Sequence, residues 1–137
     1  MVDNIRFLNP PTMATPPGYT HVVEVTGPGR IVYIAGQLGL DVDGKLAGAP
    51  GDFRAQAAQA FENLKAALAA VGATVDHIVK INSYLVDIGR NIAAFREVRD
   101  AHLNIAAPPA STTVGVPELA RPGALFEIEA VAMLPVQ

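Results

Sequence analysis

The sequence predicts an α+β fold in which two helices cover one face of a mixed β-sheet. Two segments, residues 52–71 and 91–103, repeat apolar side chains every three or four positions, as amphipathic helices do. Several shorter segments are rich in β-branched residues and alternate apolar with polar side chains, which is typical of strands. In chain order, these segments predict the arrangement β-β-α-β-α-β-β.

The first predicted elements are an extended arm and a β-hairpin. Residues 1–18 form the arm, because four prolines between positions 10 and 17 remove backbone donors and favour an extended chain. A strand is predicted over residues 19–26, a turn over the Gly-Pro-Gly segment at 27–29, and a second strand over residues 30–35. Two strands joined by a short turn that contains glycine predict a hairpin.

Residues 52–71 carry the strongest helical pattern in the chain. Asp52 is suited to the N-cap and Gly72 to the position after the C-terminus, and alanine, the best helix former, fills much of the segment. The apolar positions that define the expected buried stripe are Phe53, Ala57, Ala60, Phe61, Leu64, Leu68 and Val71.

The second half of the chain predicts a strand, a helix and two closing strands. A strand is expected over residues 75–86 and a break over residues 87–89, after which the second helix covers residues 91–103. The closing strands are expected over residues 111–116 and 125–134. Both helices can pack on the same face of the resulting sheet, which leaves the other face free.

Composition limits what this protein can be. With 137 residues, we expect one domain that spans residues 1–137. The absence of cysteine excludes disulfides, thiolate metal ligands and cysteine nucleophiles, and it favours a reducing compartment, so we expect a cytoplasmic protein. No apolar run approaches about 18 residues and the N-terminus lacks a signal-peptide pattern, so we expect no membrane segment.

Charge argues against nucleic acid and for self-association. The chain has ten Lys and Arg residues and thirteen Asp and Glu residues, and its cations are spread along the sequence. Because nucleic-acid binding needs a cluster of cations, we expect no nucleic-acid partner. Charged residues make up 17% of the chain, against about 25% in an ordinary soluble domain. Since so few charges cannot cover the surface, we expect the free sheet face to be buried in a homo-oligomer.

Motifs for metals and nucleotides are absent from the sequence. The three histidines, His21, His77 and His102, are far apart and lack the spacing of metal ligands, and His102 is interpreted as a packed histidine. Phosphate-binding glycine motifs and the GxSxG nucleophile motif are also missing. We therefore expect no metal site and no phosphate-binding loop.

Three groups of polar side chains remain as candidates for chemistry. Glu127 and Glu129 lie two residues apart in the last strand and share a face, where one could position water or both could simply be solvated. Ser111 and Thr113 begin a strand and could bind a carboxylate or carbonyl oxygen, or could only reflect strand propensity. Tyr19 could line a pocket or pack at a sheet edge.

Short motifs along nearly the whole chain match a known family. In order they are Gly18-Tyr19, Ala35-Gly36-Gln37, the helix from Ala55-Gln56 through Asn63-Leu64-Lys65 to Gly72, Ile78-Val79-Lys80, Leu85-Val86-Asp87, Pro109-Ala110 and Glu127-Ile128-Glu129-Ala130-Val131-Ala132. With these motifs the sequence resembles the Rid (YjgF-type, RutC-like) family of enamine/imine deaminases. The resemblance implies a chorismate-mutase-like α+β fold and a homotrimer whose sheets form a central barrel, with substrate sites between subunits. It also implies cofactor-free hydrolysis of reactive imines or enamines, such as 2-aminoacrylate, to a keto acid and ammonia.

The resemblance also implies roles for individual residues. Glu127 matches the family glutamate that orients the attacking water, and Tyr19 matches the pocket tyrosine. Gly36 matches the glycine of a strand-end loop, and Thr113 matches a position that supplies a backbone donor. Ser111 stands where deaminases of the family carry, directly after Pro-Ala, the arginine that grips the substrate carboxylate.

With this serine, the resemblance implies a divergent member of the family that lacks its carboxylate-binding arginine. A guanidinium–carboxylate contact contributes about 1.5–3 kcal/mol, or roughly 10- to 150-fold in binding. Arg121 or a neighbouring subunit's Arg30 could replace the missing cation, although no spacing places either in the cleft. The departure indicates either a new specificity or a lost activity.

Two functions are favoured after these exclusions. The first is a hydrolytic deaminase or related hydrolase acting on a small imine, enamine or carbonyl compound, with Glu127 orienting water. The second is a trimeric small-molecule-binding or regulatory protein without catalysis, which the low charge and the altered pocket permit. A ribonuclease is a third possibility, and the dispersed cations argue against it.

Overall fold

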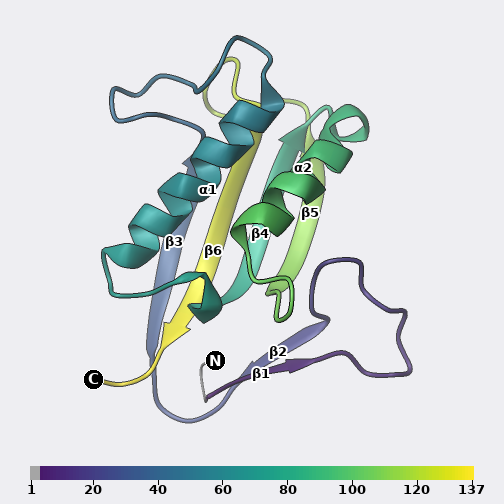
Figure 1. The fold of residues 1–137 in the computed structure, drawn as a ribbon, viewed down its shortest axis with the longest axis vertical. Coiled ribbons are helices and arrows are strands. Elements are labelled where there is room, and N and C mark those ends of the chain that lie inside the picture. The colour runs from purple at the N-terminus through teal and green to yellow at the C-terminus, as the bar shows by residue number, and fades with distance from the viewer. Residues whose placement is uncertain (1–3) are drawn as a thin grey trace.

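The computed structural model describes residues 4–137 and confirms the α+β architecture. Two helices lie side by side on one face of a four-stranded sheet, and a two-stranded sheet lies near one end of it (Figure 1). One 3-10 turn, η1 (Val75–His77), precedes the second strand of the large sheet in chain order. The other elements are β1 (Ile5–Leu8), β2 (Val22–Val25), β3 (Arg30–Leu38), α1 (Phe53–Ala69), β4 (Ile78–Val86), α2 (Ile88–His102), β5 (Ala110–Val116) and β6 (Phe126–Leu134).

The large sheet is mixed and has the strand order β3-β6-β4-β5. β4 and β5 are parallel, and the other neighbouring strands are antiparallel. The parallel pair is joined through α2, as a parallel connection requires a crossover. Helix α1 packs on β3 and β6, and α2 packs on β4 and β5, so both helices cover the same face (Figure 1). The predicted mixed sheet with two helices on one face is confirmed.

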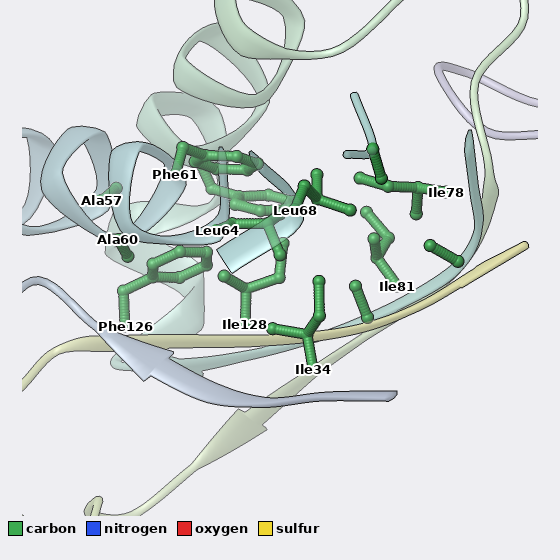
Figure 2. Close-up of a cluster of buried hydrophobic side chains, with 14 of the residues drawn as sticks. Ile34, Ala57, Ala60, Phe61, Leu64, Leu68, Ile78, Ile81, Phe126 and Ile128 are labelled. Atoms are coloured by element: carbon green, nitrogen blue, oxygen red, sulfur yellow. The ribbon is translucent and has the colours of Figure 1, made fainter. Parts of the chain in front are cut away.

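The hydrophobic core fills the space between that sheet face and the helices (Figure 2). Phe126 of β6 is fully buried, with its ring centroid 5.8 Å from those of Phe53 and Phe61 of α1. The same ring lies 5.5 Å from Phe95 of α2. One aromatic side chain therefore joins the sheet to both helices.

Helix α1 forms where the periodicity predicts it. The Asp52 side chain caps the helix by accepting a hydrogen bond from the Ala55 N–H at 3.0 Å. Gly72 follows the helix with a φ of 76°, a left-handed conformation that glycine adopts without steric cost. The predicted stripe is buried except at Val71, which lies beyond the helix and is exposed.

The predicted hairpin between the second and third strands does not form. β2 pairs with β1, with Ile5 opposite Val25, and β3 pairs with β6, with Arg30 opposite Leu134. Alternation indicates that a segment is extended but not which strand it pairs with. β3 buries Ile34 against the helices and therefore joins the large sheet, whereas β2 has no buried side chain. The prediction of a hairpin is wrong for this reason.

The predicted N-terminal arm is interrupted by β1. Residues 9–18 contain no strand and combine turns and bends with irregular backbone. Residues 5–8 instead form the strand that pairs with β2. Residues 1–3 lie outside the described part of the chain.

The second helix begins three residues earlier than predicted. Asp87 takes a left-handed φ of 54°, so one residue turns the chain and α2 starts at Ile88. The Asn91 side-chain amide donates to the Val86 carbonyl at 2.8 Å, which ties the first turn of α2 to the end of β4. The predicted break at residues 87–89 is therefore part of the helix start rather than a loop.

The sheet face opposite the helices is uncovered in the single chain. Ile31 and Tyr33 of β3 are 56% and 77% exposed on this face, while Val32 and Ile34 point into the core. Val131 of β6 lies opposite Tyr33. Among the helices of residues 4–137, none combines the length and the apolar character needed to cross a bilayer.

Candidate functional site

The first group of candidate residues lies on the helix face of β5. Ser111 and Thr113 share this face with Ile81 and Ser83, their register partners on β4, which are buried beneath the helices. Together with Tyr19 from the loop before β2, they line a pocket of about 170 Å³. The complete lining is Pro17, Tyr19, Ile92, Phe95, Arg96, Arg99, Ser111 and Thr113.

The second group lies on the opposite, uncovered face. Glu127 stands between Phe126 and Ile128, which are fully buried beneath the helices, so alternation directs its carboxylate away from them. Gly36 of β3 packs directly against this carboxylate. A Cβ atom at Gly36 would lie 1.9 Å from Glu127 Oε2, so only glycine leaves room for the side chain in this position.

A β-bulge brings Gly36 to the carboxylate. The register of β3 on β6 shifts between Ile34 and Gln37, which leaves one extra residue on β3. The Gln37 side-chain amide donates to the Ala35 carbonyl at 3.0 Å within the bulge. Bulges locally re-aim a strand and are common beside functional sites.

The two carboxylates of β6 differ in their partners. Glu129 Oε1 accepts a hydrogen bond from the Tyr84 hydroxyl at 2.5 Å. The pKa of Tyr84 is raised above its usual value, mainly by this hydrogen bond to Glu129 and to a smaller extent by desolvation. Glu127 is half-buried, and its side chain has no hydrogen-bond or ion-pair partner among residues 4–137. Of the two, Glu127 is therefore the one with both carboxylate oxygens available to a water or a substrate.

Helix α1 holds the backbone on both sides of Glu127. The buried Gln56 side chain accepts a hydrogen bond from the Leu125 N–H at 2.8 Å, just before β6 begins. The Asn63 side-chain amide donates to the Leu38 carbonyl at 3.0 Å, at the end of β3. Both strands that frame the carboxylate are thus anchored to one rigid helix.

The pocket on the helix face contains two arginines that the sequence analysis did not assign to it. Arg96 and Arg99 of α2 line the pocket, whereas Arg30 and Arg121 do not. A signal was present, because Arg99 stands four residues after Phe95 and therefore occupies the apolar stripe of the helix. A charged residue on a buried stripe is unusual enough to mark a candidate binding residue.

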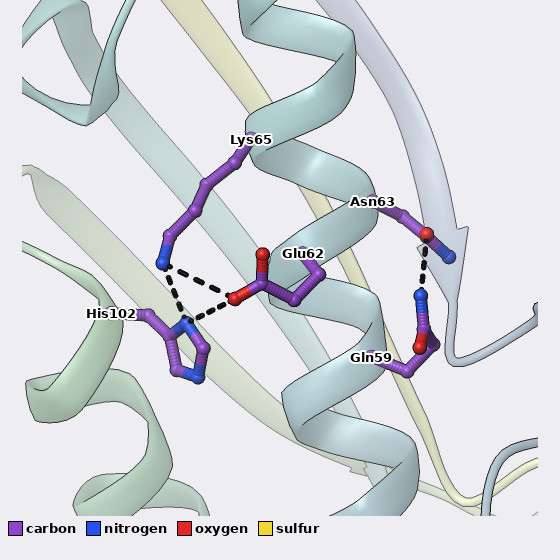
Figure 3. Close-up of polar contacts among 5 residues, drawn as sticks. All are labelled: Gln59, Glu62, Asn63, Lys65 and His102. Atoms are coloured by element: carbon purple, nitrogen blue, oxygen red, sulfur yellow. Dashed lines mark hydrogen bonds and ion pairs between the residues drawn. The ribbon is translucent and has the colours of Figure 1, made fainter.

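His102 belongs to a polar cluster between the helices rather than to either group (Figure 3). Its ring stacks on Phe61 with centroids 5.3 Å apart, which confirms the prediction of a packed histidine. Lys65 Nζ lies 2.8 Å from His102 Nδ1, and Glu62 Oε1 lies 3.5 Å from both atoms. Burial and then the Lys65 charge lower the pKa of His102, and Glu62 only partly opposes them.

This lowered pKa predicts a loss of stability on acidification. The folded state keeps the His102 ring neutral, whereas the unfolded chain takes up the proton near the ordinary pKa of about 6.5. The stabilisation is therefore complete above that value and is lost as the pH falls toward the pKa of the folded state. We expect thermal melts between pH 7.5 and 5 to show a smaller drop in midpoint for His102→Gln than for the wild type.

His21→Gln is the matched control for this experiment, because His21 lies outside the polar cluster. Carboxylates also titrate toward the acid end, so only the difference between variants reports on His102. An identical pH dependence in the wild type and in His102→Gln would contradict the prediction.

The geometry places the protein in a structural class. The chain is a small α+β protein with an uncovered sheet face, a carboxylate seated against a bulge glycine on that face, and a pocket on the opposite side. In the described range 4–137, no three His, Asp or Glu side chains gather as potential metal ligands.

Comparison with known proteins identifies the family. Residues 12–134 match the family model described as Endoribonuclease L-PSP. The chain is 38% identical over 115 residues to Protein DfrA of Myxococcus xanthus, covering 84% of each chain. It is 34% identical over 132 residues to the 2-iminobutanoate/2-iminopropanoate deaminase of Dermatophagoides farinae, covering 94% of this chain and 96% of that protein. The crystal structure of the Rid-family protein YyfB from Yersinia pestis superposes with a TM-score of 0.86 at 39% identity, covering 96% and 99% of the two chains.

The chain belongs to the Rid (YjgF) family. The chorismate-mutase-like α+β fold that the resemblance implied is thereby confirmed.

Proposed function

We propose that this protein is a hydrolytic deaminase that acts on a small reactive imine or enamine. Its site would lie in the clefts of a homotrimer, with Glu127 orienting the attacking water. The family assignment supports this reaction class, since one relative is named a 2-iminobutanoate/2-iminopropanoate deaminase. Nothing in the proposed chemistry requires a metal or a cofactor.

One observation carries the proposal most strongly, namely the free carboxylate of Glu127 against Gly36. A general base must reach a proton of the attacking water and must not be engaged elsewhere. Glu127 meets the second condition, because it has no partner in the described part of the chain, while Glu129 accepts from Tyr84.

The reaction balances without any further reagent. Water adds to the carbon of the C=N bond while Glu127 accepts one of its protons. Glu127 passes that proton to the nitrogen, which gives a carbinolamine. The hydroxyl proton then moves to the nitrogen through the same carboxylate, the C–N bond breaks, and ammonia leaves as the carbonyl forms. One imine and one water thus give one carbonyl compound and one ammonia.

The placement of the candidate residues supports a site shared between subunits. Within one chain, Glu127 and Gly36 lie on the sheet face opposite to Tyr19, Ser111 and Thr113. A small substrate that contacts both groups therefore needs Glu127 from one chain and the pocket from another. The exposed apolar residues of the uncovered face are a suitable surface for that association.

Placing a charge on this face is expected to break the trimer. Tyr33 is 77% exposed in the single chain and stands on the uncovered face, so burying an aspartate there in an interface would be unfavourable. Light scattering should give the wild type three times the 14.3 kDa of one chain and should give Tyr33→Asp a smaller mass. Val42→Asp is the control, because Val42 is 98% exposed in a loop outside the sheet. A monomeric wild type would contradict the proposed assembly.

The activity is tested by trapping imines that form in solution. An amino-acid oxidase generates imines from a panel of amino acids, and semicarbazide captures whatever is not hydrolysed. We expect the protein to lower semicarbazone formation for at least one amino acid. No acceleration over buffer with any substrate, together with thermal stabilisation by a keto acid, would instead favour the alternative of a binding protein without catalysis.

A further inference from the structure

The pocket on the helix face of β5 brings two cations to the hydroxyl groups of Ser111 and Thr113. Arg96 and Arg99 come from α2, whereas the hydroxyls come from the strand beneath it, so the tertiary fold creates this combination. Tyr19 contributes to the same wall from the loop before β2. The pocket therefore combines positive charge with neutral hydrogen-bond partners in a volume of about 170 Å³.

Arg99 is held in this pocket by several contacts. Its side chain is 8% exposed, and its guanidinium carbon lies 5.6 Å from the centroid of the Phe95 ring. Burying a guanidinium is unfavourable unless hydrogen bonds replace the lost water. Within residues 4–137, the one partner of this guanidinium is Asp100, which accepts from Nε at 2.9 Å. The terminal Nη1 and Nη2 atoms have no acceptor from the described chain and stay open to water or a ligand, since neither belongs to its fully buried, unpartnered atoms.

The loop before β2 leaves room for this guanidinium. A Cβ atom at Gly18 would lie 2.2 Å from Arg99 Nη2, so any other residue would displace the guanidinium. Gly18 also has a φ of 96°, which side-chain-bearing residues rarely adopt. The position of Arg99 beside the pocket is therefore specified by its neighbours on both sides.

The charge balance of the pocket favours a small anion. Asp100 is half-exposed and binds Nε, so it compensates only one of the two arginines. Two unoccupied Nη donors in one plane match the two oxygens of a carboxylate, which guanidinium binds in a bidentate manner. The hydroxyls of Ser111 and Thr113 can donate to the same oxygens or to a neighbouring carbonyl.

We propose that Arg99, assisted by Arg96, binds the carboxylate of a small organic acid in this pocket. In family deaminases the carboxylate-binding arginine directly follows Pro-Ala, at the position of Ser111. In this protein Arg99 of helix α2 would supply the cation instead, and the small Ser111 side chain would leave space for its guanidinium. The identification of the bound acid as a substrate or product rests on the proposed deaminase function. The binding of the carboxylate itself does not.

Binding is tested with pyruvate, its neutral amide pyruvamide, and inorganic phosphate. We expect pyruvate to shift the NMR signals of the Ser111 and Thr113 amides and of the Arg99 Nε–H, and pyruvamide to bind at least tenfold more weakly. Equal affinity for pyruvate and pyruvamide would overturn the proposal. Phosphate that shifts these signals while pyruvate does not would also overturn it, because the site would then select a different anion.

Variants of Arg99 separate charge recognition from packing. Arg99→Gln should weaken pyruvate binding by roughly 10- to 150-fold, and Arg99→Lys should retain part of the affinity. Arg54→Gln is the matched control, since Arg54 pairs with Glu97 on the helix surface, away from the pocket lining. If Arg99→Gln does not fold, the NMR titrations of the wild type with pyruvate and pyruvamide still test the proposal. Unchanged affinity in a folded Arg99→Gln would refute it.

The two proposals can fail separately. A protein that binds pyruvate through Arg99 but hydrolyses no imine would contradict the deaminase and leave the carboxylate site standing. Imine hydrolysis that persists undiminished in Arg99→Gln would overturn the role of Arg99 and leave the deaminase standing.

Discussion

Replacing Glu127 with glutamine is expected to slow imine hydrolysis by about 10²- to 10⁴-fold, the usual contribution of a positioned general base. Glutamine keeps the size and shape of the side chain, so the contact with Gly36 should survive. It cannot accept a proton from water in the way a carboxylate does. The loss should therefore appear in the rate of the chemical step, measured as the fall in kcat in the semicarbazide assay.

Glu129→Gln is the matched control for this substitution. Glu129 lies on the same strand face two residues away, but its oxygen is engaged by the Tyr84 hydroxyl. We expect this variant to retain most of the activity of the wild type. Equal losses in both variants would indicate a general effect of charge on the sheet face and would argue against a base at Glu127. Full activity in Glu127→Gln would exclude Glu127 as the general base.

The largest effect on stability is expected for Phe126→Ala. Phe126 is fully buried and contacts Phe53 and Phe61 of α1 as well as Phe95 of α2. Its removal opens a cavity at the point where both helices meet the sheet. Such substitutions lower the free energy of unfolding by about 3–5 kcal/mol. Urea unfolding at fixed chain concentration measures the change, because the stability of the proposed trimer would depend on that concentration.

Val42→Ala serves as the reference for this experiment. Val42 is 98% exposed in a loop, so its truncation should change the free energy of unfolding by less than about 0.5 kcal/mol. A loss below about 1 kcal/mol for Phe126→Ala would show that the core tolerates the cavity or that the ring is not central to it.

Much of this fold follows from periodicity that the chain carries locally. The apolar positions of α1 and the alternation along β6 depend on residues close together in sequence, and the structure buries almost all of them as predicted. The direction of Glu127 also follows from local alternation. Its sequence neighbours Phe126 and Ile128 are buried, so the carboxylate points away from the core.

The pairing of strands does not follow from such patterns. A short extended segment between residues 19 and 26 has the same alternation whether it pairs with β3 or with β1. The choice depends on which segment buries more apolar surface against the helices, and β3, which contributes Ile34 to the core, joins β6. This competition is between distant parts of the chain, so local periodicity cannot decide it.

By itself, the sequence determined both helices, the four strands of the large sheet, the shared face of Glu127 and Glu129, and the resemblance to the Rid family. It did not reveal the strand at residues 5–8. Only the tertiary structure decided that Gly36 packs on Glu127, that the candidate residues divide between two sheet faces, and that Arg99 reaches the pocket beside Ser111. The physical reason is the same in each case. Local periodicity sets the direction of a side chain, but its neighbours are set by the packing of segments that lie far apart in the chain.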